Sequence, residues 1–116
     1  MDFEEFDKNN SILPIDVEKL NSEYKLFVNE LLPIDILKIK VWYNYKTKEY
    51  YAYPNVEIVV DKESGLTDII CGIGETEEEA LNDCVNRFLA LVSYYENKFK
   101  NKLMSTDFKY VSTEDF

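Results

Sequence analysis

The residues of this chain that could carry chemistry gather around one junction between a strand and a helix. Gly72-Ile73-Gly74 precedes the junction, with Cys71 before it and Cys84 after it. A glycine pair before a helix can cradle a phosphate, because the helix start offers free N–H groups and a positive dipole end. Residues 75–79 carry four glutamates, which would repel that phosphate. We therefore predict that this junction is not a phosphate-binding loop.

Histidine is absent from the chain. Its absence removes the usual general base near neutral pH, the Ser–His and Cys–His nucleophile systems, and the commonest metal ligand. Two cysteines without histidine do not form an ordinary zinc site, and we interpret Cys71 and Cys84 as buried, reduced thiols. Carboxylate pairs remain candidates for a metal or glycosidase site, although helix capping already accounts for the acids at 75–79. We predict no cofactor, no metal ion and no enzymatic activity.

The charge of the chain is strongly negative. Its 116 residues carry 23 acids against 13 bases, for a net charge of −10, and residues 1–30 and 61–90 hold most of the excess. Such a surface repels phosphate backbones, so direct nucleic-acid binding is not expected. A basic protein partner and simple solubility both fit this charge.

Length and composition indicate one domain outside the membrane. A chain of 116 residues, 46% of them hydrophobic, can build one domain with its own core. Residues 1–6 are acidic and lack the basic and apolar regions of a signal peptide. No apolar run approaches the ~20 residues of a membrane span. We expect a cytoplasmic protein that makes no membrane contact.

Alternating hydrophobicity predicts three antiparallel strands. Residues 37–45 alternate between apolar and polar side chains, which is the period of a half-buried strand. The next strands cover Tyr50–Val60 and Leu66–Ile73. Pro54-Asn55 interrupts the former, which predicts an edge position or a bulge there.

Helical spacing predicts one helix on each side of these strands. The first covers about Ile15 to Leu32, with Pro14 in its first turn. The second begins at Thr76, whose side chain pairs with Glu79 in a capping box. The apolar stripe of the second helix consists of Ala80, Leu81, Cys84, Val85, Phe88, Leu89, Val92, Tyr95 and Phe99.

Together these elements make a single α+β domain in the order helix, three-stranded antiparallel sheet, long helix (αβββα). The domain covers residues 14–102, between a flexible acidic arm at 1–13 and a flexible tail at 103–116. The tail either adds a short edge strand around residues 108–111 or stays loose. Both helices are expected on one face of the sheet.

Aromatic residues crowd the first hairpin of the sheet. Five tyrosines lie close to Trp42 in the sequence: Tyr43, Tyr45, Tyr50, Tyr51 and Tyr53. Tyrosine and tryptophan are enriched in binding hot spots, and they are also common strand formers. Because side chains alternate along a strand, Trp42 and either Tyr51 or Tyr53 should lie on the outer face. We predict a partner surface here, or a homodimer formed by strand addition at the edge of the second strand.

Part of the chain resembles the HicB antitoxin family. Tyr50-Tyr51-Ala52-Tyr53-Pro54, followed by Gly74-Glu75-Thr76-Glu77-Glu78-Glu79-Ala80-Leu81, is similar to a strand of that family and its "G-x-T-x-E-E-A" helix entry. The resemblance implies a protein that neutralises a small basic toxin ribonuclease. The chain departs from the family by a helix before the sheet and by a longer second strand.

Two further resemblances concern the order of elements. The order helix, three strands, helix is similar to that of the double-stranded RNA-binding domain. Residues 77–79 are glutamates where that family carries lysines for phosphates, so its RNA function is not implied. Thr76, Ala80 and Cys84 also resemble the helix of a small phage-encoded α-β-α sandwich domain, a family of largely unassigned function.

The leading functional prediction is a non-catalytic inhibitor of a basic, nucleic-acid-handling host protein. Phage and mobile-element factors of the anti-CRISPR and anti-restriction type share this size and acidity, and their carboxylates imitate DNA phosphates. The alternatives are a HicB-like antitoxin that neutralises a small basic toxin and a nucleic-acid binder similar to the RNA-binding domain. The predicted partner-binding residues come from the acidic helix start and the outer sheet face: Glu75, Glu77, Glu78, Glu79, Asp83, Lys38, Lys40, Trp42, Tyr51 and Tyr53.

Overall fold

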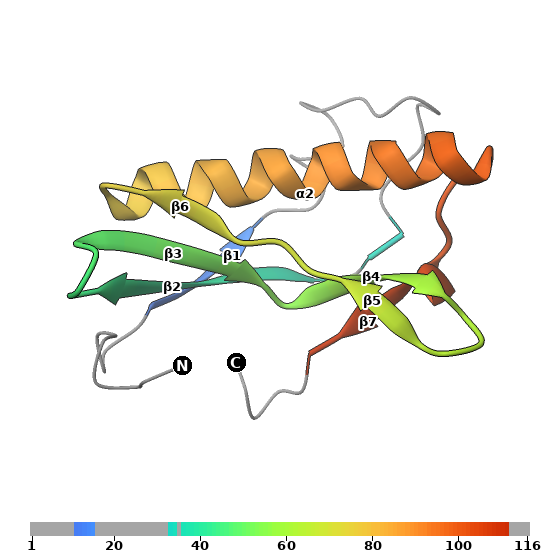
Figure 1. Cartoon of the computed structure of the whole chain (residues 1–116), viewed down its shortest axis with the longest axis horizontal. Coiled ribbons are helices and arrows are strands. Elements are labelled where there is room, and N and C mark those ends of the chain that lie inside the picture. Colours follow the sequence, from blue (N-terminus) through green and yellow to red (C-terminus); the bar gives the residue numbers. More distant parts are fainter. Residues whose placement is uncertain (1–10, 16–32, 35, 112–116) are drawn as a thin grey trace.

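The computed structural model of the chain describes residues 11–15, 33–34 and 36–111. This part is a small α+β domain in which one long helix, α2 (Glu77–Phe99), lies along one side of two antiparallel sheets (Figure 1). The first sheet has the strand order β1-β2-β3-β6 and the second β5-β4-β7. Their bounds are β1 Ser11–Ile15, β2 Leu37–Asn44, β3 Glu49–Pro54, β4 Val56–Asp61, β5 Leu66–Asp68, β6 Gly72–Gly74 and β7 Phe108–Tyr110.

Two of the predicted strands are each divided between the sheets. The strand predicted over Tyr50–Val60 breaks at Asn55 into β3 and β4, which belong to different sheets. The interruption predicted there is confirmed, but the edge position is wrong, because β3 lies between β2 and β6 and β4 lies between β5 and β7. The strand predicted over Leu66–Ile73 likewise becomes β5 and β6. The described residues therefore carry seven strands in two sheets where three in one sheet were predicted.

Asn55 holds the break in place through every polar group that it has. Its side-chain oxygen accepts a hydrogen bond from Lys38 N at 2.9 Å, and its side-chain nitrogen donates to Ile36 O at 3.2 Å. Its backbone N–H donates to Lys38 O, and its carbonyl accepts from Val111 N. Asn55 is only 8% exposed. The residue thus ties the junction of the sheets to β2 on one side and to the end of β7 on the other.

The beginning and the end of the predicted domain both need correction. Pro14 and Ile15, predicted in the first helix, lie in β1, where they pair with β2; residues 11–13, predicted in the arm, lie there too. Pro14 fits this place because β1 is an edge strand, where a missing N–H is tolerated. Residues 1–10 and 16–32 lie outside the described part.

The tail predicted at 103–116 belongs to the domain as far as residue 111. Leu103 is buried, a 3₁₀ turn follows at Ser105–Asp107, and β7 pairs with β4. The edge strand that the sequence left as one of two alternatives therefore forms. Buried Glu96, at the end of α2, accepts a hydrogen bond from Leu103 N at 3.1 Å and so fixes the return of the chain toward β7.

The core lies between α2 and the sheets. Residues facing α2 from β2 and β3 alternate with outward residues, as the period of two predicted. The apolar stripe predicted for α2 is buried over most of its length, but Leu81 is half-buried and Phe99 is 39% exposed. The largest fully buried side chains include Phe88, Leu37, Ile39, Ile58, Leu103 and Val56.

Both ends of α2 are capped. Thr76 accepts a hydrogen bond from Glu79 N at 3.1 Å, which confirms the predicted N-cap. The Glu79 carboxylate accepts a hydrogen bond from Glu75 N at 3.0 Å. In a standard capping box it would instead accept from the backbone N–H of the N-cap residue, which is Thr76 here. At the other end, Lys100 takes a left-handed conformation and closes the helix. No helix in the described part has both the length and the apolarity needed to cross a membrane.

Replacement of Asn55 by alanine tests its role at the junction. Asn55→Ala leaves Lys38 N and Ile36 O without these side-chain partners, so we expect the free energy of unfolding to fall by about 1–3 kcal/mol. The measurement is urea unfolding followed by far-UV circular dichroism. Asn86→Ala, on the exposed side of α2, is the matched control and should change stability by less than about 0.5 kcal/mol. Equal effects of the two variants would contradict this role.

Tyr95 links α2 to the second sheet, and this link makes the free energy of unfolding depend on pH in the alkaline range. Its hydroxyl donates to the Asp68 carboxylate in β5 at 2.8 Å. This hydrogen bond, followed by burial, raises the pKa of Tyr95 to about 12 from its ordinary 10.0. The protonated phenol is thus favoured by folding, so its contribution is complete below pH 10.0 and is lost as the pH rises toward about 12.

Tyr95→Phe should therefore be less stable than the parent chain at pH 8 by about 1 kcal/mol, and the difference should shrink between pH 10.0 and about 12. Urea midpoints at these pH values measure it. Tyr94→Phe, at an exposed neighbouring position, is the control. A difference that stays constant with pH would argue against the proposed linkage.

Candidate protein-binding surface

The face of the first sheet opposite α2 gathers the aromatic residues that the sequence singled out. Strand register pairs Trp42 with Tyr51 and Lys40 with Tyr53, and Tyr51 pairs in turn with Ile73 of β6. We call this surface the outer sheet face: Ile12, Lys38, Lys40, Trp42, Tyr51, Tyr53 and Ile73. The prediction that Trp42 lies outward with Tyr51 or Tyr53 is confirmed, and both tyrosines are there. Sequence reasoning missed Ile12 and Ile73, because they come from strands whose neighbours only the structure shows.

The remaining tyrosines of the hairpin face the other way or lie in its turn. Tyr43 and Tyr50 form a cross-strand pair on the α2 side, with their ring centroids 4.8 Å apart. Tyr45 contacts Tyr43 edge-to-face at 4.9 Å. The aromatic cluster of the sequence is therefore two clusters, one for packing and one on the outer sheet face.

Side chains of the outer sheet face interact with one another. The Lys40 ammonium lies 4.7 Å from the centroid of the Trp42 ring, within cation–π range. Burial and a hydrogen bond with Cys71 raise the pKa of Tyr53. Trp42, Tyr51 and Tyr53 are each half-buried. The face thus offers broad ring surfaces held by their neighbours, which lowers the entropy cost of binding.

Burial disfavours the thiolate form of both cysteines. Burial raises the pKa of the Cys71 thiol, and burial raises that of Cys84 to about 12. Both are free cysteines, and a thiol with a raised pKa is largely protonated at neutral pH. In the described ranges, no three metal-ligating side chains lie close enough together to hold an ion.

The acidic residues of the helix start have two different roles. Glu75, Glu77, Glu78 and Glu79 are all exposed. The last three lie in the first turn of α2, where a negative charge interacts favourably with the positive end of the helix dipole, and Glu75 precedes the N-cap Thr76. Glu79 also closes the cap through Glu75 N. Three carboxylates, those of Glu75, Glu77 and Glu78, remain directed to no partner within the described part of the chain.

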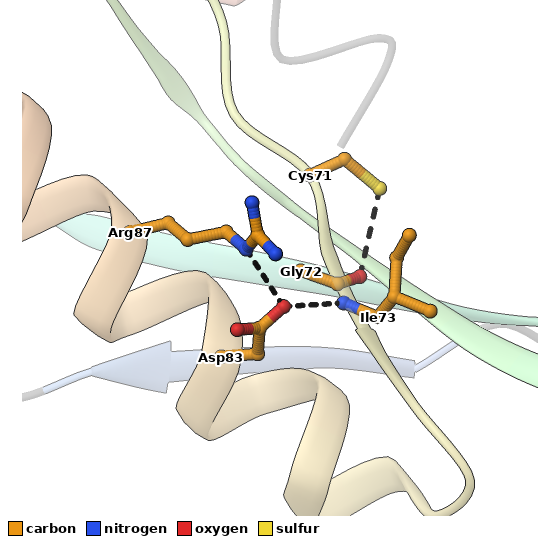
Figure 2. Close-up of polar contacts among 5 residues, drawn as sticks. All are labelled: Cys71, Gly72, Ile73, Asp83 and Arg87. Carbon is orange, nitrogen blue, oxygen red and sulfur yellow. Dashed lines mark hydrogen bonds and ion pairs between the residues drawn. The ribbon is translucent and has the colours of Figure 1, made fainter.

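Asp83 is held in the structure and does not join these carboxylates. One of its oxygens accepts hydrogen bonds from Ile73 N and from Arg87 Nε, each at 2.9 Å (Figure 2). The bond from Ile73 N and the ion pair with Arg87 lower the pKa of Asp83. Asp83 therefore covers a backbone donor at the outer edge of β6, which hinders pairing with another strand there. Its spacing of four from Arg87 was the available signal in the sequence.

The proposed route to a homodimer by strand addition at the second strand is wrong. Strand β3 is paired on both sides, with β2 and β6, so it offers no edge. Among the described strands, β1 and β6 form the two edges of the first sheet. The hairpin still offers side chains for a contact, both on the outer sheet face and at Tyr45, which is 55% exposed.

Gly72 and Gly74 allow α2 to approach β6 closely. A Cβ atom at Gly72 would lie 2.4 Å from Ala80 O and Cys84 N, and one at Gly74 would lie 2.5 Å from Ala80 N. These are backbone atoms of α2, which cannot rotate away. The glycine pair is thus explained by packing, and the absence of a phosphate-binding function here stays a prediction.

Comparisons of the chain with protein-family models, with curated proteins and with solved structures gave no match. The resemblances proposed from the sequence stay predictions.

Substitution of Gly72 tests the close approach of α2. Gly72→Ala should lower the free energy of unfolding by about 1–3 kcal/mol, because the new methyl group meets helix backbone. Gly65→Ala is the comparison: nothing lies within 4 Å of its Cβ, but its φ of +75° strains any side chain, which costs about 1 kcal/mol. The measurement is thermal unfolding of both variants. A smaller loss at Gly72 than at Gly65 would show that β6 and α2 are not tightly packed.

Proposed function

We propose that this protein is a non-catalytic binding module that inhibits a basic, nucleic-acid-handling protein, as phage and mobile-element inhibitors of host nucleases do. The observation that carries the proposal is that two surfaces of different chemistry meet at β6. Ile73 belongs to the outer sheet face, and Glu75 begins the acidic helix start two residues later. One partner can therefore contact aromatic rings and carboxylates together.

The two surfaces contribute different parts of the binding free energy. Exposed carboxylates of Glu75, Glu77 and Glu78 attract a lysine- and arginine-rich groove and imitate the phosphates that it normally binds. Rings of Trp42 and Tyr51 supply the apolar contact from which most affinity comes. A protein bound in this way blocks the nucleic-acid groove without any chemical step.

A HicB-like antitoxin is the second candidate. It is favoured by the pairing of β3, the strand that carries the resemblance, with β6, directly before the matching helix entry. A small basic protein encoded beside this chain would support it. A nucleic-acid binder that uses Lys38 and Lys40 is the third candidate, and a mobility shift at low salt would support that function instead.

Charge reversal at the helix start tests the proposed function. The chain is immobilised and used to capture proteins from a host lysate at low and at physiological salt, followed by binding and nuclease assays with the purified partner. We expect a basic partner whose nucleic-acid cleavage is inhibited. The affinity for this partner should fall as the salt concentration rises. It should also fall by on the order of tenfold in the double variant Glu77→Lys/Glu78→Lys.

Glu63→Lys is the control, because Glu63 is exposed in the turn between β4 and β5, away from the helix start. It should keep most of the affinity. Binding that does not change with salt, or that both variants weaken equally, would contradict the role given to the acidic helix start.

A further inference from the structure

A cavity of about 680 Å³ lies near the end of α2, away from the acidic helix start. It is lined by β4, by the last turn of α2 and by the segment that leads into β7, three elements that Figure 1 shows close together. Its volume is within the ~300–1,000 Å³ of small-molecule sites. The described apolar residues that line it are Val59, Val60, Phe99, Leu103 and Met104.

Contacts within the described part of the chain hold the apolar lining of this cavity in place. The Phe99 ring stacks on the Tyr95 ring, with their centroids 5.6 Å apart. The Tyr95 hydroxyl in turn donates a hydrogen bond to Asp68. The backbone N–H of Leu103 donates to the buried Glu96 carboxylate at 3.1 Å. The lining is therefore formed before a ligand arrives, which lowers the entropy cost of binding.

Two of the lining side chains remain in contact with water. Met104 is 62% exposed and Phe99 is 39% exposed, whereas Leu103 is 2% exposed. A ligand with an apolar body would cover Met104 and Phe99 and gain free energy in proportion to the apolar area removed from water. The flexible thioether chain of Met104 can adapt to the outline of such a ligand.

The charged groups that line the cavity are already engaged. The Lys62 ammonium lies 3.2 Å from one oxygen of Asp107, and the other oxygen of Asp107 accepts a hydrogen bond from Met104 N at 2.7 Å. Lys102 also lines the cavity and takes part in an interaction of its own. A charged ligand would therefore lose part of its hydration without gaining an unpaired counter-charge, and this loss costs free energy. An uncharged ligand avoids that cost.

We propose that this cavity binds an uncharged apolar molecule, one with an aliphatic or aromatic body and at most a hydroxyl group. The body covers Phe99 and Met104 and reaches Leu103. A hydroxyl group stays at the mouth of the cavity, where it keeps its hydrogen bonds with water. This site is separate from the surfaces of the proposed function and does not depend on them.

The experiment uses the full chain and three ligands with the same straight tail: decanol, decanoate and decyltrimethylammonium, all below their solubility and micelle limits. Binding is measured by calorimetry and by the methyl NMR signals of Met104 and Val60. We expect decanol to bind and to shift these signals. Decanol should bind about tenfold tighter than either ion, because neither ion finds an unpaired counter-charge in the cavity.

Two variants and a matched control place the site. Met104→Glu puts a carboxylate into the apolar lining at an exposed position and should weaken decanol binding about tenfold or more. Asp107→Asn removes the counter-charge of Lys62 but keeps an oxygen for Met104 N, so decanoate should bind about threefold tighter than it binds the parent chain. Tyr45→Glu also puts a carboxylate in place of a large exposed side chain, in the turn between β2 and β3, and should leave decanol binding unchanged. Circular dichroism checks that the variants are folded.

Several results would overturn the proposal. These are no binding of decanol, binding of either ion as tight as that of decanol, and an affinity for decanol that Met104→Glu leaves unchanged or that Tyr45→Glu weakens equally. An unchanged affinity for decanoate in Asp107→Asn would contradict selection by the paired charges. The inhibitor function is tested with other residues and a protein partner, so the two proposals can fail separately.

Discussion

The architecture depends on how Asn55 satisfies its own polar groups while buried between two sheets. A chain that passes from one sheet to another loses its ladder partners at the crossing, and each lost partner in the interior costs free energy. Asn55 replaces them with an amide that accepts from Lys38 N and donates to Ile36 O. Leucine offers neither group, and an ionised aspartate offers no donor. The position therefore requires an amide.

The division of the chain at Asn55 determines what α2 must do. Because β3 and β4 diverge into different sheets, a single helix has to cover both. The helix packs closely against Gly72 of β6 near its start. Near its end, the Tyr95 hydroxyl donates a hydrogen bond to the Asp68 carboxylate. A helix of 23 residues is about 35 Å long. The acidic helix start and the residues around Phe99 are thus kept at opposite ends of one helix.

Much of the regular structure was predictable from local signals. The start of α2 was predicted from Thr76 and Glu79, since a cap is a contact between near neighbours, and the alternation of β2 was equally local. Pro14 was misassigned because proline suits both a helix start and an edge strand; only pairing with β2 decides between them. The buried position of Glu96 was not predictable from its neighbours in α2 either, because its carboxylate accepts a hydrogen bond from Leu103 N, beyond the end of the helix.

The candidate site was also predictable only where it depends on local signals in the sequence. The alternation of side chains along a strand shows which residues share a face, so the outward position of Trp42 and Tyr51 could be predicted from the sequence. The role of Asp83 could not be predicted, because it depends on β6 being an edge strand. The structure also gives Gly72, Gly74, Thr76, Glu79 and Ala80 tasks in packing and capping.

A motif whose residues all have structural tasks gives little information about activity, because any protein with this strand-to-helix junction would need them. The side chain of Ile73 is different. It is 44% exposed on the side of the sheet away from α2, where the packing of the helix does not require a large apolar side chain. Such a side chain on an exposed face is easier to explain by binding than by folding. Function is therefore better sought in the residues of the outer sheet face than in the glycine and glutamate motif that dominates the sequence.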